Sequence, residues 1–216
     1  WTLLFAFYLV QYFVIIFFNT ALAGVALKRL RGEGASVSEG LALAGSRIGA
    51  IFGYALIAAT VGLLLRMVQE RLGLIGRFIV GLIGLAWTVA TFLVVPVLAG
   101  EGIGPVDAVK RSVELLRRTW GENLIGNAGL SVVFTLIGVL LALASVALVG
   151  GALATHSVAA FLTAIAIVVL AFIVLALVQS SLQGVYAAAL YRYAEEGEAG
   201  AGIPPALLEQ AFRSKG

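Results

Sequence analysis

Long apolar runs alternate with short polar segments along this sequence. No charged residue occurs in 1–27, 48–65, 78–100 or 123–191. A helix needs about 20 mostly apolar residues to cross a membrane, so each of the first three runs is long enough for one crossing. The fourth run is long enough for two, and glycines and polar residues near its middle divide it. The pattern therefore predicts five membrane-spanning helices, near residues 1–27, 47–66, 74–99, 123–149 and 157–190.

The composition indicates that lipid is the solvent for much of the protein surface. Apolar residues make up 62% of the chain and charged residues only 12%, whereas a soluble domain carries about a quarter charged residues. The strands of a membrane β-barrel would alternate polar and apolar positions, and these runs do not alternate. We therefore predict an all-α, polytopic membrane helix bundle that forms a single domain over residues 1–216.

The basic residues are distributed unevenly between the two ends of the predicted spans. Eleven of the 14 lysines and arginines fall in 28–47, in 99–122 and in the C-terminal tail, which five spans would place on one side. Because cytoplasmic loops carry the excess of basic residues, we expect these segments and the C-terminus in the cytoplasm. Arginine outnumbers lysine, which together with abundant alanine and glycine is typical of a GC-rich bacterial source, so we expect a bacterial inner membrane protein. The chain begins at Trp1 and its only methionine is Met67, so we expect further residues upstream.

Residues 105–118 form the clearest amphipathic segment. Its apolar face consists of Val106, Val109, Val113 and Leu116. Its charged face consists of Asp107, Lys110, Arg111, Glu114, Arg117 and Arg118. Three oppositely charged pairs have the i,i+4 spacing that stabilises a helix, namely Asp107–Arg111, Lys110–Glu114 and Glu114–Arg118. We predict a helix lying in the membrane interface, whose basic residues are candidates for binding anionic lipid or a partner. These candidates are Lys110, Arg111, Arg117 and Arg118; the alternative is a solvated helix that only fixes the topology.

Glycines recur every four residues at the start of the second predicted span, at Gly45, Gly49 and Gly53. Ser36 and Glu39 have the spacing of a capping box, which predicts that this helix begins inside the cytoplasmic loop and continues through the glycines. Helices associate in lipid where small residues let their backbones approach closely. We therefore expect the glycine face to pack against a neighbouring helix of the same chain, with a second protomer as the alternative.

The predicted cytoplasmic segments resemble one another. Glu33-Gly34 and Glu101-Gly102 each follow the end of a span, and the tail carries a related Gly-Ile-Pro-Pro sequence at 202–205. We interpret this as a degenerate internal repeat of a spanning helix, a short turn, an interfacial helix and a return span. The alternative is that glycine and proline simply recur in loops.

The sequence offers few groups for chemistry. There are no cysteines, and the single histidine, His156, falls in a predicted outer turn with no acidic residue nearby. Neither a Ser–His–acid arrangement nor a phosphate-binding loop stands out, so we expect no enzyme activity, cofactor or metal. Polar residues inside the spans either line a solute path or join helices by hydrogen bonds, and we favour the second. They are Gln11, Asn19, Thr20, Asn123, Asn127, Ser131, Gln179, Ser180, Ser181 and Gln183.

Two stretches resemble a known family. Residues 91–127 read TFLVVPVLAGEGIGPVDAVKRSVELLRRTWGENLIGN, and residues 19–34 read NTALAGVALKRLRGEG. Both are similar to an uncharacterised bacterial family of multipass membrane proteins, a domain of unknown function, and the resemblance extends over most of the chain. The first stretch also resembles, more weakly, the membrane domain attached to some glycerophosphodiester phosphodiesterases, and carries no catalytic residues. These resemblances imply a fold and no particular activity.

The leading hypothesis is a non-catalytic scaffold or accessory membrane subunit. Its partners would be membrane lipids, anionic ones included, and other membrane protein subunits, with no nucleic acid. The alternative is a channel or transporter for a small solute. No carboxylate falls securely in the middle of a predicted span, which argues against a proton- or sodium-coupled carrier but not against a neutral pore.

Overall fold

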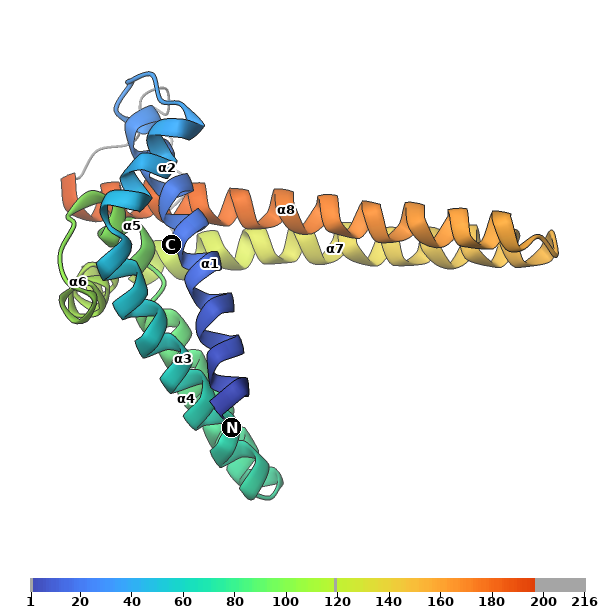
Figure 1. The fold of residues 1–216 in the computed structure, drawn as a ribbon, viewed down its shortest axis with the longest axis horizontal. Coiled ribbons are helices and arrows are strands. Elements are labelled where there is room, and N and C mark those ends of the chain that lie inside the picture. Colours follow the sequence, from blue (N-terminus) through green and yellow to red (C-terminus); the bar gives the residue numbers. More distant parts are fainter. Residues whose placement is uncertain (1, 119, 197–216) are drawn as a thin grey trace, which may run out of the picture. The chain divides into compact units, whose positions relative to one another are not determined.

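The structure, a computed structural model, describes residues 2–118 and 120–196 (Figure 1). Within this part of the chain there are eight α-helices and no strand, which confirms the all-α prediction. The helices are α1 (Thr2–Leu30), α2 (Val37–Ser46), α3 (Ile48–Arg71), α4 (Leu74–Ala90), α5 (Val94–Gly100), α6 (Pro105–Arg118), α7 (Trp120–Ala154) and α8 (Val158–Glu196).

Five helical stretches of the described chain are long enough and apolar enough to cross a membrane. They are Thr2–Leu30, Ile48–Arg71, Gly76–Gly100, Gly129–Ala154 and Val158–Glu195. Their surfaces carry many exposed large apolar side chains, such as Leu3, Phe78 and Leu140, in numbers that a soluble monomer does not tolerate. The predicted number of five spans is therefore confirmed, and the chain is a polytopic membrane protein.

The second predicted helix is divided into two. Ser36 caps the start of α2 as expected, because its Oγ accepts the backbone N–H of Glu39 at 3.3 Å. However, α2 ends at Ser46 and α3 begins at Ile48, with Arg47 between them in a non-helical conformation. The prediction of one continuous helix is therefore wrong, because α2 turns back to pack along α1 before α3 begins.

The third predicted helix is also divided. It breaks at residues 91–93, between α4 and α5, whereas the sequence analysis predicts one helix near 74–99. Proline has no N–H and its ring clashes with the carbonyl four residues earlier, which here belongs to Phe92. The break therefore lies where Pro96 prevents the regular helical hydrogen bonds.

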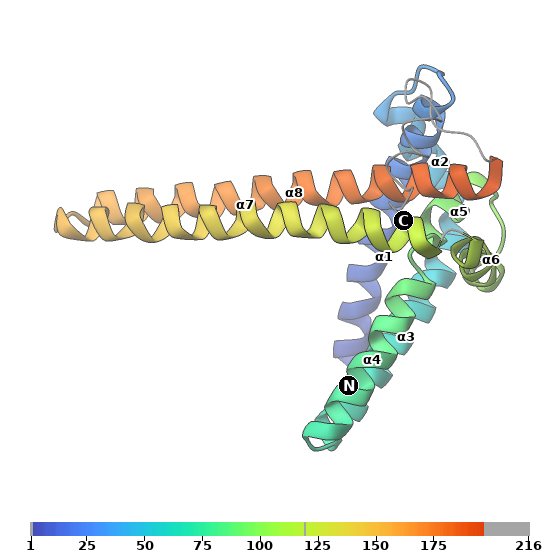
Figure 2. The ribbon, with the colours of Figure 1, turned by 180° about the vertical axis from the view of Figure 1, so that it is seen from behind.

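The chain divides into two compact units. Residues Gly121–Gln183 form a helical hairpin of α7 and the first part of α8, closed by a turn in which His156 has a φ of +53° (Figure 2). The other unit contains α1 to α6 and the last part of α8, and its core brings together residues of α1, α2, α3, α5, α6 and α8. The prediction that residues 1–216 form a single domain stays a prediction.

The order of elements supports the interpretation of an internal repeat. A span, a left-handed glycine, a short helix and a further helix follow one another twice, first through Gly32 and α2, then through Gly102 and α6. The φ angles of these glycines are +80° and +65°, a region that glycine enters without steric cost. The sequence motif pairs Gly102 with Gly34, but the backbone conformation shows that the equivalent of Gly102 is Gly32. The related segment at 202–205 lies outside the described residues.

Candidate functional site

Helix α6 has the predicted bounds and lies against α3, α4 and α5. Its buried side chains are Ala108, Ser112, Leu115 and Leu116. The predicted apolar face is wrong by about one position, since Val106 is 55% exposed and Leu116 is its only buried member. The difference arises because a polar residue, Ser112, lies in the middle of the buried face.

Ser112 bridges the break between α4 and α5. Its Oγ donates a hydrogen bond to the carbonyl oxygen of Ala90 at 2.7 Å and accepts one from the N–H of Leu93 at 3.1 Å. The break leaves these two backbone groups without helical partners, and a buried unsatisfied group costs roughly 1–3 kcal/mol. Ser112 is completely buried, so it stabilises the break and attaches α6 to it. The sequence gives one signal of this role: Ser112 is a small residue four positions after Ala108, so the two lie on the same face of the helix.

Arg111 lies at the centre of a polar cluster that we call the junction, which consists of Glu101, Arg111, Glu114, Tyr191 and Glu195. The Arg111 guanidinium contacts Glu101 at 3.0 Å, Glu114 at 3.1 Å and Glu195 at 2.9 Å. The hydroxyl of Tyr191 also donates to Glu101, at 3.4 Å. The junction therefore joins the end of α5, helix α6 and the end of α8, segments that are up to 94 residues apart between Glu101 and Glu195.

The ion pairs predicted along α6 are formed only in part. Glu114 and Arg118 pair at 2.7 Å, as expected. Lys110 pairs instead with Asp107, at 3.2 Å. Arg111 uses Glu101 and Glu195, which lie outside the helix, because the bundle brings both carboxylates to its guanidinium.

The junction is partly shielded from solvent, which strengthens its electrostatics relative to surface pairs. The side chains of Arg111, Glu101 and Glu195 are 25%, 21% and 30% exposed. Hydrogen bonds to Glu101, then Glu114 and Glu195, raise the pKa of Arg111 above its ordinary value. The hydrogen bond from Arg111 lowers the pKa of Glu114. Arg111 and Glu114 therefore both carry their charges at neutral pH.

Two further polar contacts lie between the segments that are predicted to be cytoplasmic. Arg47 Nη1 donates to the carbonyl oxygen of Gly102 at 3.4 Å, and Arg192, which is buried, donates to the carbonyl oxygen of Leu30. Together with the junction, these contacts bring 28–47, 99–122 and the end of α8 into one region. This juxtaposition is what a five-span topology requires of segments on the same side of a membrane.

The four basic residues predicted as a lipid or partner surface have different surroundings. Arg111 is committed to the junction. Lys110 and Arg118 are 73% and 59% exposed and each pairs with one carboxylate of α6. Arg117 is exposed and forms no ion pair with a described residue. The surface that is available for other molecules thus consists of Lys110, Arg117 and Arg118.

The predicted glycine face is not continuous, because Gly45 belongs to α2 while Gly49 and Gly53 belong to α3. A Cβ at Gly53 would lie 2.8 Å from Pro105 Cγ, so this glycine does seat a neighbouring element. Gly45 and Gly49 are exposed, and a Cβ there would meet no described atom within 4 Å. The expectation of close packing within the chain is therefore wrong for these two positions.

Two other glycines, Gly24 and Gly40, lie where α1 and α2 approach each other closely. A Cβ at Gly40 would lie 2.6 Å from the carbonyl oxygen of Ala21, and one at Gly24 would collide with the Leu43 side chain. The sequence analysis missed this pair, because the two glycines lie in different helices and form no repeat. Their contact depends on α2 turning back along α1.

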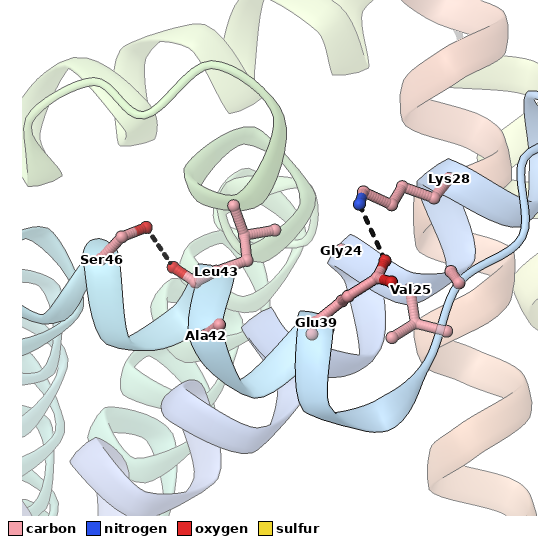
Figure 3. Close-up of a pocket in the computed structure, with 9 residues that line it drawn as sticks. Gly24, Val25, Lys28, Glu39, Ala42, Leu43 and Ser46 are labelled. Carbon is pink, nitrogen blue, oxygen red and sulfur yellow. Dashed lines mark hydrogen bonds and ion pairs between the residues drawn. The ribbon is translucent and has the colours of Figure 1, made fainter.

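A groove of about 360 Å³ lies beside this contact (Figure 3). Across it Lys28 Nζ and Glu39 Oε2 form an ion pair at 2.9 Å, with both side chains nearly half exposed. The hydrogen bond from Lys28 lowers the pKa of Glu39. The two charges satisfy each other, so the groove presents no uncompensated charge to a ligand.

A second groove of about 360 Å³ lies between α4 and α6. Its lining is apolar except for one arginine, Arg117. The lining residues are Leu82, Leu85, Ala86, Val89, Ala90, Val113, Leu116 and Arg117.

The polar residues inside the spans do not gather at either groove. Thr20 is buried, and its hydroxyl donates to the carbonyl of Ile16 in its own helix at 2.7 Å, not to a neighbouring helix. Asn123 and Asn127 lie outside the described side chains. His156 is exposed and borders a small groove at the α7–α8 turn, with mainly apolar neighbours.

Comparison with known proteins gives a family without an activity. No curated protein and no solved structure matches the chain. The model of a family of unknown function, DUF6159, matches residues 1–201, which confirms the resemblance to an uncharacterised family. The weaker resemblance to the phosphodiesterase-attached membrane domain stays a prediction. Since the match covers nearly the whole sequence, the chain belongs to this family of unknown function.

Proposed function

We propose that this protein is a non-catalytic scaffold or accessory subunit of a bacterial inner membrane, which holds α6 in the cytoplasmic headgroup layer. In this proposal Lys110, Arg117 and Arg118 contact anionic lipid, and the same surface is available to other membrane subunits. The observation that carries it is the two-sided environment of α6. Its inner side is attached to the bundle through Ser112 and Arg111, while three cations remain exposed on its outer side.

The attachment of α6 to the bundle consists of contacts with other helices and not of contacts within α6. Ser112 joins α6 to the α4–α5 break, and Arg111 joins it to α5 and α8. A basic residue near an anionic membrane surface contributes about 1 kcal/mol of attraction. A surface held in one orientation can therefore bind lipid without the loss of side-chain and backbone freedom that a loose segment would pay.

The orientation is part of the proposal and is tested by cysteine labelling, since residues 1–216 contain no cysteine. A cysteine at Gly34 should resist an impermeant thiol reagent in intact cells and react after the membrane is opened. A cysteine at Gly151, in the α7–α8 turn region, should react in intact cells. The reverse pattern would contradict the cytoplasmic location of α6.

The lipid contact is tested by thermal unfolding of the full chain in nanodiscs. Discs containing phosphatidylglycerol should give a higher melting temperature than discs of phosphatidylcholine alone, and salt should reduce the difference because it screens exposed charges. Replacing Lys110, Arg117 and Arg118 together with glutamine should abolish the difference. An unchanged difference in this triple variant would refute the assignment of the surface.

The alternative of a channel or transporter is tested by reconstitution into proteoliposomes. Vesicles with the protein should release or take up small neutral and charged solutes at the same rate as empty vesicles. Flux above the empty-vesicle rate that the triple variant retains would contradict a scaffold and favour a channel or transporter.

A further inference from the structure

We propose that the groove between α4 and α6 is a binding site for one anionic phospholipid, with an acyl chain along α4 and the phosphate at Arg117. This inference rests on the proposed function and narrows it, from a basic surface to a defined site. The groove combines an apolar trough with a single cation at its α6 side. These features match the two parts of an anionic phospholipid, its apolar acyl chain and its negatively charged phosphate.

The apolar part has the dimensions of a lipid chain segment. From Leu82 to Ala90, α4 rises about 12 Å at about 1.5 Å per residue, and Val113 and Leu116 of α6 form the facing wall. Leu82 and Leu85 are 50% and 60% exposed. An acyl chain in this groove of about 360 Å³ would gain dispersion contacts with both walls, and acyl chains are the molecules that a spanning helix meets in greatest abundance.

The charge at the groove selects an anionic headgroup. Among the basic residues of α6, Arg111 is bound to three carboxylates, Lys110 to Asp107 and Arg118 to Glu114. Arg117 forms no ion pair with a described residue, and it is the one that lines the groove. An arginine can donate two parallel hydrogen bonds to a phosphate. The other three basic residues already bind carboxylates of the protein, so Arg117 is the one whose guanidinium can bind a lipid phosphate.

The test is a titration of the purified full chain in neutral detergent with dioleoyl phosphatidylglycerol, followed by native mass spectrometry. Arg117→Gln should weaken the first binding event about tenfold, because a charge-assisted bidentate contact is lost. The matched control is Arg77→Gln, which removes the same charge from an exposed position of α4 that does not line the groove, and should change the affinity less than about twofold. Lys110→Gln, on the same exposed side of α6 but away from the groove, should weaken the first binding event less than Arg117→Gln does.

The apolar part is tested by filling the groove. Ala86→Phe places a ring in the trough, and should also weaken binding about tenfold if the acyl chain lies there. Its control is Ile83→Phe, on an exposed position of α4 that does not line the groove. Leu85→Trp is a second filling variant, to be used if Ala86→Phe does not keep the helical circular dichroism of the natural chain.

The possible outcomes separate the inference from the proposed function. Equal weakening by Arg117→Gln and Lys110→Gln would mean a diffuse basic surface, which overturns the groove and leaves the proposed function standing. Equal affinity of the natural chain for phosphatidylglycerol and phosphatidylcholine would overturn both. Loss of a dimer in Ala86→Phe without loss of lipid would assign the groove to a second copy of the chain, and overturn the lipid site.

Discussion

Removing the Ser112 hydroxyl should destabilise the protein more than a serine-to-alanine change usually does. The hydroxyl is the partner of two backbone groups at the break, the part-buried carbonyl of Ala90 at 2.7 Å and the buried N–H of Leu93 at 3.1 Å. Each group left unsatisfied costs roughly 1–3 kcal/mol, so Ser112→Ala should lower the free energy of unfolding by about 2–6 kcal/mol. The complete burial of Ser112 and Leu93 favours the upper part of this range, because water does not reach the Leu93 N–H to replace the lost partner.

The assay for Ser112→Ala is reversible unfolding in mixed micelles, with increasing amounts of a denaturing detergent and with helix content as the signal. The matched control is Ser46→Ala, since Ser46 is exposed and its Oγ donates to a carbonyl of its own helix at 2.7 Å. This control should change stability by less than about 0.5 kcal/mol. Hydrogen exchange should also accelerate at the Leu93 amide in Ser112→Ala. If both variants unfold at the same detergent fraction as the natural chain and Leu93 stays protected, the bridging role of Ser112 is refuted.

Two other predictions address the α1–α2 contact and the junction. Gly40→Ala should cost about 1–3 kcal/mol through overpacking against α1, whereas Gly49→Ala, with no described atom within 4 Å, should leave the melting temperature unchanged or slightly raised; equal effects of the two would contradict the assigned contact. The pKa of Glu114 is lower in the folded protein than its ordinary value of 4.5, so its ion pair stabilises the fold above that value and loses this effect as the pH falls through the folded pKa. Arg111→Gln should therefore flatten the decline in melting temperature between about pH 5 and pH 3; an unchanged pH profile would show that Arg111 does not stabilise the fold through this carboxylate.

The spans could be predicted because membrane insertion depends on a local property of the sequence. A run of about 20 apolar residues suffices to cross the hydrocarbon layer whatever lies elsewhere in the chain. The bounds of α6 were equally accessible, since Pro105 suits a first turn and the charged face ends at Arg118. The cap at Ser36 followed from a spacing of three residues alone.

The breaks within the second and third predicted helices could not be located from local pattern. Arg47 and residues 91–93 lie within segments that read as good helix, and each break is stabilised by contacts from distant parts of the chain. Pro96 signals a disturbance in the third helix, but its position does not tell a kink from a complete break. The hydrogen bonds of Ser112, 19 and 22 residues away from the break, make the broken form favourable.

The charged residues of α6 at the candidate site could be predicted from the sequence, but the residues that Arg111 binds could not. The sequence analysis predicted that Arg111 is a basic residue of an interfacial helix, but it also predicted an ion pair with Asp107. The sequence of a helix indicates only the pairs within that helix, which have i,i+4 spacing. Glu101 and Glu195 reach Arg111 through the tertiary fold. For the same reason, Gly45 and Gly49 looked like a packing face by their period, while Gly40 lies at the close contact.

The rotation of α6 about its own axis is fixed by two neighbouring residues that point in different directions. Ser112 and Arg111 are consecutive, so their side chains leave the helix about 100° apart. One is bound at the α4–α5 break, and the other at Glu101 and Glu195. A small rotation of the helix would break one of these attachments and leave buried polar groups without partners. Apolar packing could not offset this cost, because no hydrophobic effect drives helices together in lipid. The outward direction of Arg117 therefore follows from the inward attachment of Ser112 and Arg111, and the two polar contacts determine which charges the protein presents to the membrane surface.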